Sequence, residues 1–242
     1  MNRRDILIGA ALAVVPAMMR PALPAPTRTL VFQSGGRPVA LDISEPARLG
    51  ARPAVLLLHG RAGLSFYGPA LQSLADGLAA AGMIALTLHY FDASGSADSP
   101  QVTQALFETW RSALSDALAF TAIQPEVDAG RIAVVGVSLG GFIAGVEAAQ
   151  NERIAALVSE SSGVSTWFPA NPRRMPPLLI VHSRDDETVP LSNALRLAQI
   201  ARQFRVEPQI VLYGGKDHVL TGATAKEADA EIVAFLADRL RA

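Results

Sequence analysis

The chain has 242 residues, half of them apolar, which is enough for one large buried core. Its 21 Lys and Arg residues against 22 Asp and Glu residues give a formal net charge of -1, which argues against attraction to nucleic acid or anionic lipid. Cysteine is absent, and this excludes disulfides, thiolate metal sites and a cysteine nucleophile. Any chemistry must therefore come from Ser, His and carboxylate side chains.

The first 26 residues have the layout of an export signal. Arg3 and Arg4 precede an apolar run over residues 6–19, and a segment rich in Pro and Ala follows. The arginine pair resembles the bacterial twin-arginine signal, with an ordinary secretory leader as the alternative. We expect residues 1–26 to be a leader and residues 27–242 to be one domain. The mature protein would then be periplasmic or secreted, without stable membrane association.

The mature chain alternates short apolar runs with segments of helical periodicity. Two strands are expected between residues 29 and 43, joined by a turn at Ser34-Gly35-Gly36. The further strands are expected at 53–59, 83–89, 131–137, 154–158, 177–182 and 209–213. The helices are expected at 69–81, 102–122, 139–150, 191–204 and 225–240.

This alternation predicts an α/β fold, with a mostly parallel central sheet of about eight strands and helices on both faces. Residues 159–175 lack clear periodicity and are too few for a second domain. We therefore expect a minimal lid or none over any site at the carboxyl edge of the sheet.

The segment Gly136-Val137-Ser138-Leu139-Gly140 matches Gly-x-Ser-x-Gly, the nucleophile elbow. The motif needs a sharp turn from a strand into a helix, and the match lies between an expected strand and an expected helix. Ser138 is therefore the candidate nucleophile. The alternative is a glycine-rich turn with a bystander serine.

A serine hydroxyl needs a base, and His218 is the candidate because it lies late in the chain in a loop after a strand. The other three histidines, His59, His89 and His182, each end an expected strand and are expected to serve local hydrogen bonding. An acid should follow a strand between the serine and the histidine. Asp185 and Asp186 both meet that requirement, and only one of two neighbouring side chains can reach the imidazole.

Acyl transfer also needs hydrogen-bond donors where negative charge develops on the carbonyl oxygen. After an elbow, one donor is the N–H of the next residue, Leu139, and another comes from the loop after an early strand, where we expect Arg61. Aromatic residues in loops at the same end of the sheet are expected to line a substrate pocket, with ordinary packing as the alternative for each. They are Phe66, Tyr67, Tyr90 and Trp167.

Over residues 30–242 the chain resembles α/β-hydrolases of the dienelactone hydrolase group. The segments that carry the resemblance are LLHGRAG at 57–63, GVSLGG at 136–141, HSRDDETVP at 182–190 and GGKDH at 214–218. The resemblance implies the α/β-hydrolase fold, Asp186 as the acid, and no metal or organic cofactor. Dienelactone hydrolases proper carry cysteine in the elbow, whereas this chain has Ser138, which is more similar to the carboxylesterases of the group.

The sequence therefore predicts a serine hydrolase that cleaves small-molecule or polymer-borne carboxylic esters through an acyl-serine intermediate. Ser138, Asp186 and His218 would form its triad. A serine peptidase of the prolyl-peptidase type is one alternative, because such peptidases share this catalytic domain. A non-catalytic binding protein that keeps the hydrolase fold is the other. Nucleic acid is not an expected partner.

Overall fold

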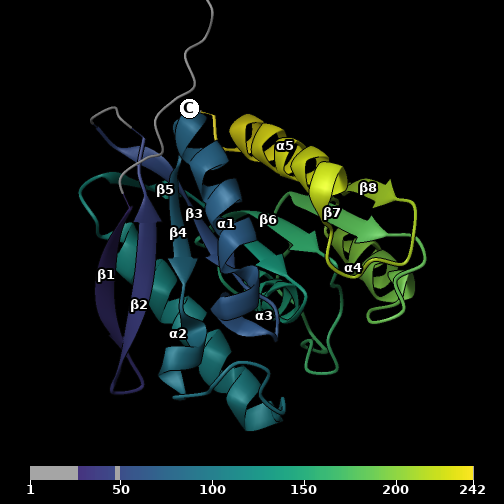
Figure 1. Cartoon of the computed structure of the whole chain (residues 1–242), viewed down its shortest axis with the longest axis horizontal. Helices are drawn as coiled ribbons and strands as arrows, with labels where there is room; N and C mark the ends of the chain where they lie inside the picture. The colour runs from purple at the N-terminus through teal and green to yellow at the C-terminus, as the bar shows by residue number, and fades with distance from the viewer. Residues whose placement is uncertain (1–26, 47–49, 242) are drawn as a thin grey trace, which may run out of the picture.

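The computed structural model describes residues 27–46 and 50–241, so the expected leader at 1–26 lies outside the described residues. An eight-stranded sheet forms the centre, in the order β1-β2-β4-β3-β5-β6-β7-β8 (Figure 1). β1 and β2 form an antiparallel hairpin, β2 pairs antiparallel with β4, and every further neighbouring pair is parallel. The prediction of a mostly parallel sheet of about eight strands is confirmed.

The strands are β1 (Thr27–Ser34), β2 (Arg37–Ser44), β3 (Arg52–Leu58), β4 (Ile84–Leu88), β5 (Val127–Val137), β6 (Ile154–Glu160), β7 (Leu178–Ser183) and β8 (Gln209–Tyr213). The helices are α1 (Gly63–Ala80), α2 (Gln104–Ala122), α3 (Leu139–Ala148), α4 (Leu191–Gln203) and α5 (Gly222–Arg239), with a short 3₁₀ helix, η1 (Tyr90–Ala93).

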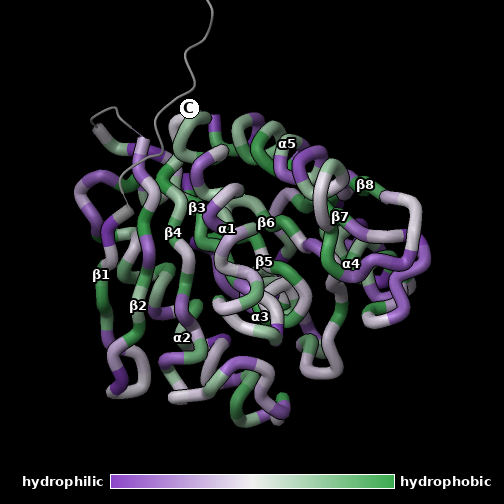
Figure 2. Tube along the Cα trace, in the orientation of Figure 1, coloured by the Kyte–Doolittle hydropathy of each residue, from purple (hydrophilic) through white to green (hydrophobic). Residues whose placement is uncertain are grey.

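Helices cover both faces of the sheet, and each face has its own hydrophobic core. α1 and α5 pack on one face, and α2, α3 and α4 pack on the other (Figure 1). β3 shows how one strand serves both cores: Leu56 and Leu58 face the α2–α4 side, and Val55 and Leu57 face the α1 and α5 side. Successive side chains of a strand point to opposite faces, so an uninterrupted apolar run is what this position requires. Figure 2 shows hydrophobic residues concentrated along the central strands.

Some element bounds differ from the sequence-based expectation; β5, for example, begins at Val127, four residues before the expected start at 131. α1 begins at Gly63, six residues before the expected start at Pro69, and the proline lies inside the helix. Proline lacks a backbone N–H and is most common in the first turn of a helix. The sequence pattern therefore predicted a helix start at Pro69. η1 was not predicted, because four residues are too few to show a helical period.

Glu160, at the end of β6, is partly buried and lies near α5. Burial raises the pKa of Glu160 to about 7, and the nearby carboxylate of Asp229 on α5 adds to the rise. Burial also raises the pKa of Asp229 to about 6. An acid whose pKa is higher in the folded than in the unfolded state destabilises the fold as pH rises between those two values. For Glu160 this interval runs from 4.5 to about 7.

The variant Glu160→Gln should therefore gain thermal stability over the wild type at pH 8 but not at pH 4, where both side chains are neutral. We expect the melting-temperature difference to grow by about 3 °C or more between the two pH values. Glu231→Gln on the exposed side of α5 is the matched control, because it leaves the burial of charge unchanged. A difference for Glu160→Gln that is the same at both pH values would contradict the assignment.

Candidate active site

Ser138 occupies a strained turn between β5 and α3. Its φ of 53° and ψ of -117° lie outside the regions that non-glycine residues favour. The two glycines of the motif let backbone segments approach closely around it. A Cβ at Gly136 would lie 2.4 Å from the Gly140 carbonyl oxygen, and a Cβ at Gly140 would lie 2.5 Å from the Leu58 carbonyl oxygen. The sequence motif is therefore present as a built elbow, with its hydroxyl at the carboxyl edge of the sheet.

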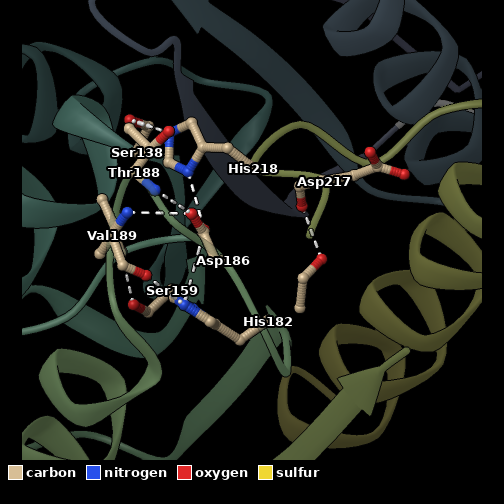
Figure 3. Close-up of polar contacts among 10 residues, drawn as sticks. Ser138, Ser159, His182, Asp186, Thr188, Val189, Asp217 and His218 are labelled. Carbon is tan, nitrogen blue, oxygen red and sulfur yellow. Dashed lines mark hydrogen bonds and ion pairs between the residues drawn. The ribbon is translucent and has the colours of Figure 1, made fainter. Parts of the chain in front are cut away.

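The imidazole of His218 meets the Ser138 hydroxyl. Nε2 lies 2.8 Å from Ser138 Oγ, although the two residues are 80 positions apart in the chain (Figure 3). His218 follows β8 and Ser138 follows β5, and both strands end at the same edge because they run parallel. The geometry suits a hydroxyl that donates to Nε2, which requires the proton of a neutral imidazole to be on Nδ1.

The carboxylate of Asp186 completes this arrangement. Its Oδ2 lies 2.8 Å from His218 Nδ1, and its Oδ1 accepts hydrogen bonds from the N–H groups of Thr188 and Val189 at 2.8 and 2.9 Å (Figure 3). Burial opposes ionisation of the carboxyl group, but these three donors outweigh it and hold the pKa of Asp186 below its ordinary value. Asp186 is therefore a charged, hydrogen-bonded partner for Nδ1.

The neighbouring carboxylates lie elsewhere. Asp185 is exposed, whereas Asp186 is only 5% exposed. Asp217, next to His218, is also exposed, and its carbonyl oxygen accepts a hydrogen bond from Ser183 Oγ at 2.6 Å. Of the two aspartates that the residues alone left open, the structure brings Asp186 to the imidazole.

The two residues expected to supply backbone donors, Leu139 and Arg61, line the cavity that Ser138 also lines. Leu139 is the first residue of α3, and the leading N–H groups of a helix have no acceptor within it. Gly140 N–H donates to the His59 carbonyl oxygen at 3.1 Å, which ties the start of α3 to the loop that contains Arg61. Arg61 and Leu139 line the same cavity as Ser138.

That cavity has a volume of about 370 Å³ and opens beside the serine hydroxyl. Its walls are mostly apolar, with a few polar side chains. The lining residues are Arg61, Val102, Phe107, Ser138, Leu139, Phe142, Val164, Ser165, Thr166, Trp167 and Asn193.

The four aromatic residues expected in a pocket have different positions. Trp167 lines the cavity and packs against Phe107, with ring centroids 4.8 Å apart. Tyr67 is buried against Gly60, where a Cβ would lie 2.4 Å from the tyrosine ring. Burial raises the pKa of the Tyr67 hydroxyl, and a hydrogen bond to Ser138 opposes the rise. Phe66 is 57% exposed and lies outside the cavity lining.

The expectation that Tyr90 lines the pocket is wrong. Tyr90 is fully buried, its ring stacks on His59 with centroids 4.1 Å apart, and its hydroxyl donates to the His59 carbonyl oxygen at 2.8 Å. Burial lowers the pKa of His59 to about 4, so this imidazole is neutral. The two buried rings pack beneath the start of the loop that contains Arg61, and neither residue lines the cavity.

Most of the cavity wall could not be predicted from the sequence. Val164, Ser165 and Thr166 belong to the segment without periodicity, and Phe142 and Asn193 lie on α3 and α4. The missing periodicity of residues 159–175 was the one available signal that this segment forms an irregular wall. In the described parts of the chain no three His, Cys, Asp or Glu side chains are grouped to hold a metal ion. No helix of residues 27–46 or 50–241 is long and apolar enough to cross a membrane.

The fold resembles those of known hydrolases. A protein assigned as a dienelactone hydrolase from Klebsiella pneumoniae superimposes with a TM-score of 0.69 at 18% identity, over 88% of this chain and 99% of that one. Est1E from Butyrivibrio proteoclasticus gives 0.68 at 15% identity, over 87% and 98%. The acylaminoacyl peptidase of Pyrococcus horikoshii gives 0.67 at 17% identity, over 90% of this chain but 42% of the peptidase.

Identities this low establish the fold and nothing finer. No curated protein matches the sequence. The family model for the dienelactone hydrolase family, however, matches residues 42–235, which is most of the chain. The resemblance expected from the four motifs is thereby confirmed, and the chain belongs to the dienelactone hydrolase family of α/β-hydrolases.

Proposed function

We propose that the protein is a serine hydrolase that cleaves carboxylic esters through an acyl-serine intermediate. The observation that carries the proposal is the pair of 2.8 Å hydrogen bonds that His218 makes, one to Ser138 Oγ and one to Asp186 Oδ2. A nucleophile, a base and an orienting acid in this relation are what activation of a hydroxyl at neutral pH requires.

In the proposed acylation step, Ser138 Oγ attacks the carbonyl carbon of the ester while His218 Nε2 takes the hydroxyl proton. The charged Asp186 stabilises the imidazolium that forms and stays ionised itself, as its lowered pKa favours. When the tetrahedral intermediate collapses, the bond to the alcohol oxygen breaks and His218 gives the proton to the departing alcohol.

Deacylation repeats the same steps with water. His218 takes a proton from a water molecule as the water oxygen attacks the acyl carbon, and it returns the proton to Ser138 Oγ when the carboxylic acid leaves. In both steps the negative charge on the carbonyl oxygen is stabilised by the N–H groups of Leu139 and Arg61. Each such donor typically contributes about 3 to 4 kcal/mol to the transition state.

The cavity beside Ser138 favours an ester whose acyl group is compact and apolar. Its volume of about 370 Å³ and its Phe107, Phe142 and Trp167 walls suit such a group, while its few polar side chains supply orientation. Peptidase activity is the second candidate, because the fold superimposes on one part of an acylaminoacyl peptidase. The family match favours ester hydrolysis.

Labelling with a fluorophosphonate probe tests the nucleophile. We expect stoichiometric modification of the wild type at Ser138, no modification of Ser138→Ala, and a loss of kcat for ester hydrolysis of about 10⁴-fold or more in that variant. Mass spectrometry of the labelled peptide identifies the site. A folded wild type that neither reacts with the probe nor hydrolyses chromogenic esters would favour the non-catalytic binding protein.

The identity of the acid is tested by two matched substitutions at adjacent positions. Asp186→Asn should lower kcat by about 10⁴-fold, because an amide stabilises the wrong imidazole tautomer and cannot stabilise the imidazolium. Asp185→Asn, at an exposed position, should change kcat by no more than about twofold. Steady-state kinetics on one chromogenic ester compares the two, and equal losses would exclude Asp186 as the sole acid.

The cavity wall is tested by acyl-chain selectivity. Trp167→Ala should enlarge the cavity and raise kcat/KM for a hexanoate ester relative to an acetate ester by about tenfold or more. Phe66→Ala is the control, because it removes an aromatic ring that lies outside the lining. If both variants keep the wild-type ratio, the acyl group binds elsewhere.

A further inference from the structure

The last two residues of β7 carry buried polar side chains that the proposed reaction does not use. His182 is completely buried and Ser183 is 1% exposed. Because successive side chains of a strand point to opposite faces, the two reach different loops. His182 contacts the loop of the acid (Figure 3), and Ser183 contacts the loop of the base.

His182 holds the acid loop through one backbone carbonyl. Its Nε2 lies 2.9 Å from the Val189 carbonyl oxygen, which only accepts, so Nε2 carries the proton. The same nitrogen lies 3.7 Å from Asp186 Oδ2. His182 Nδ1 is buried and has no hydrogen-bond partner in the described residues. A buried polar group that is only half satisfied needs an explanation other than stability.

The Val189 contact gives that explanation, because Val189 is bound from two directions. Its N–H donates to Asp186 Oδ1 at 2.9 Å, and its carbonyl oxygen accepts from His182 Nε2. The imidazole thereby fixes the peptide segment that in turn fixes the carboxylate. An apolar side chain at position 182 would leave the Val189 carbonyl without its donor and would release this segment.

Ser183 does the same for the base. Its Oγ donates to the Asp217 carbonyl oxygen at 2.6 Å, one residue before His218. Two backbone bonds join the same pair of loops, from Arg184 N–H to the Tyr213 carbonyl and from Asp185 N–H to the Gly215 carbonyl. One strand end therefore contacts the segments that carry both partners of the 2.8 Å bond between Asp186 and His218.

We propose that His182 and Ser183 are positioning residues that set the distance between Asp186 and His218, His182 through Val189 and Ser183 through Asp217. The proposal rests on the proposed serine hydrolase function, since its consequence is the alignment of the base with Ser138. Neither side chain touches substrate, so their loss should lower kcat and leave KM unchanged.

The test compares three side chains at position 182. Gln places an amide donor where the imidazole has Nε2, Asn places it where the imidazole has Nδ1, and Leu has no donor. We expect His182→Asn and His182→Leu to lower kcat and the rate of fluorophosphonate labelling by about 10- to 100-fold, with KM within about twofold. His182→Gln should stay within about threefold of the wild type.

Two further variants complete the experiment. Ser183→Ala should show the same loss of kcat at constant KM. The control is Ser34→Ala, which removes another buried hydroxyl, one that is bonded to Asp116. Ser34 lies on the edge strand β1, away from β7, so this variant should leave kcat unchanged. In an Asp186→Ala background, His182→Leu should cause no further loss, because a residue that acts through Asp186 has nothing left to position.

The outcomes separate this proposal from the proposed function. A wild type that resists the probe would overturn the function itself. If the wild type reacts with the probe but His182→Gln and His182→Asn are labelled at equal rates, the positioning role alone is overturned. The same follows if His182→Leu causes a further loss of kcat in the Asp186→Ala background. Melting temperatures show whether each variant is folded, and the contrast between Gln and Asn decides the question if His182→Leu does not fold.

Discussion

The two hydrogen bonds of one imidazole are the constraint on which the rest of the site depends. His218 contacts Ser138 through Nε2 and Asp186 through Nδ1, both at 2.8 Å. These residues come from three loops, after β5, β7 and β8. The carboxyl ends of these strands lie at one edge because the strands run parallel. The site therefore depends on the sheet topology, since its hydrogen-bond geometry tolerates errors of only a few tenths of an ångström.

The same edge must also accept a strained residue. Ser138 has a positive φ without being glycine, and backbone strain persists only where the surroundings fix it. Here the surroundings are close backbone contacts: Gly140 N–H bonds to the His59 carbonyl oxygen, and Ser138 N–H bonds to the Glu160 carbonyl oxygen at 2.9 Å. The buried His59 and Tyr90 rings support the first of these contacts. The elbow is thus held from β6 on one side and from the loop after β3 on the other.

The order of strands and helices could be predicted because strands that are buried on both faces have uninterrupted apolar runs. Such runs can be recognised directly in the sequence. The direction of an individual side chain could not. Asp185 and Asp186 have the same chemistry, and their difference arises from which one turns toward the imidazole. Tyr90 was expected in a loop after a strand, and it does follow β4 in η1, but nothing in the pattern shows that its ring stacks on His59. Cavity walls in residues 159–175 depend on loop geometry, which has no period to detect.

A serine in the elbow raises the demand on this alignment. A thiol ionises far more readily than a hydroxyl, so a cysteine enzyme tolerates a loosely held base better than a serine enzyme does. For the proposed reaction of this chain, which has no cysteine, His218 would have to be held in place and its developing charge stabilised at the moment of attack. Asp186 receives three hydrogen bonds, from His218, Thr188 and Val189, and its pKa is lowered as a result. A carboxylate held in this way keeps both its charge and its position. A weakly acidic hydroxyl nucleophile requires both of the carboxylate that is hydrogen-bonded to its base.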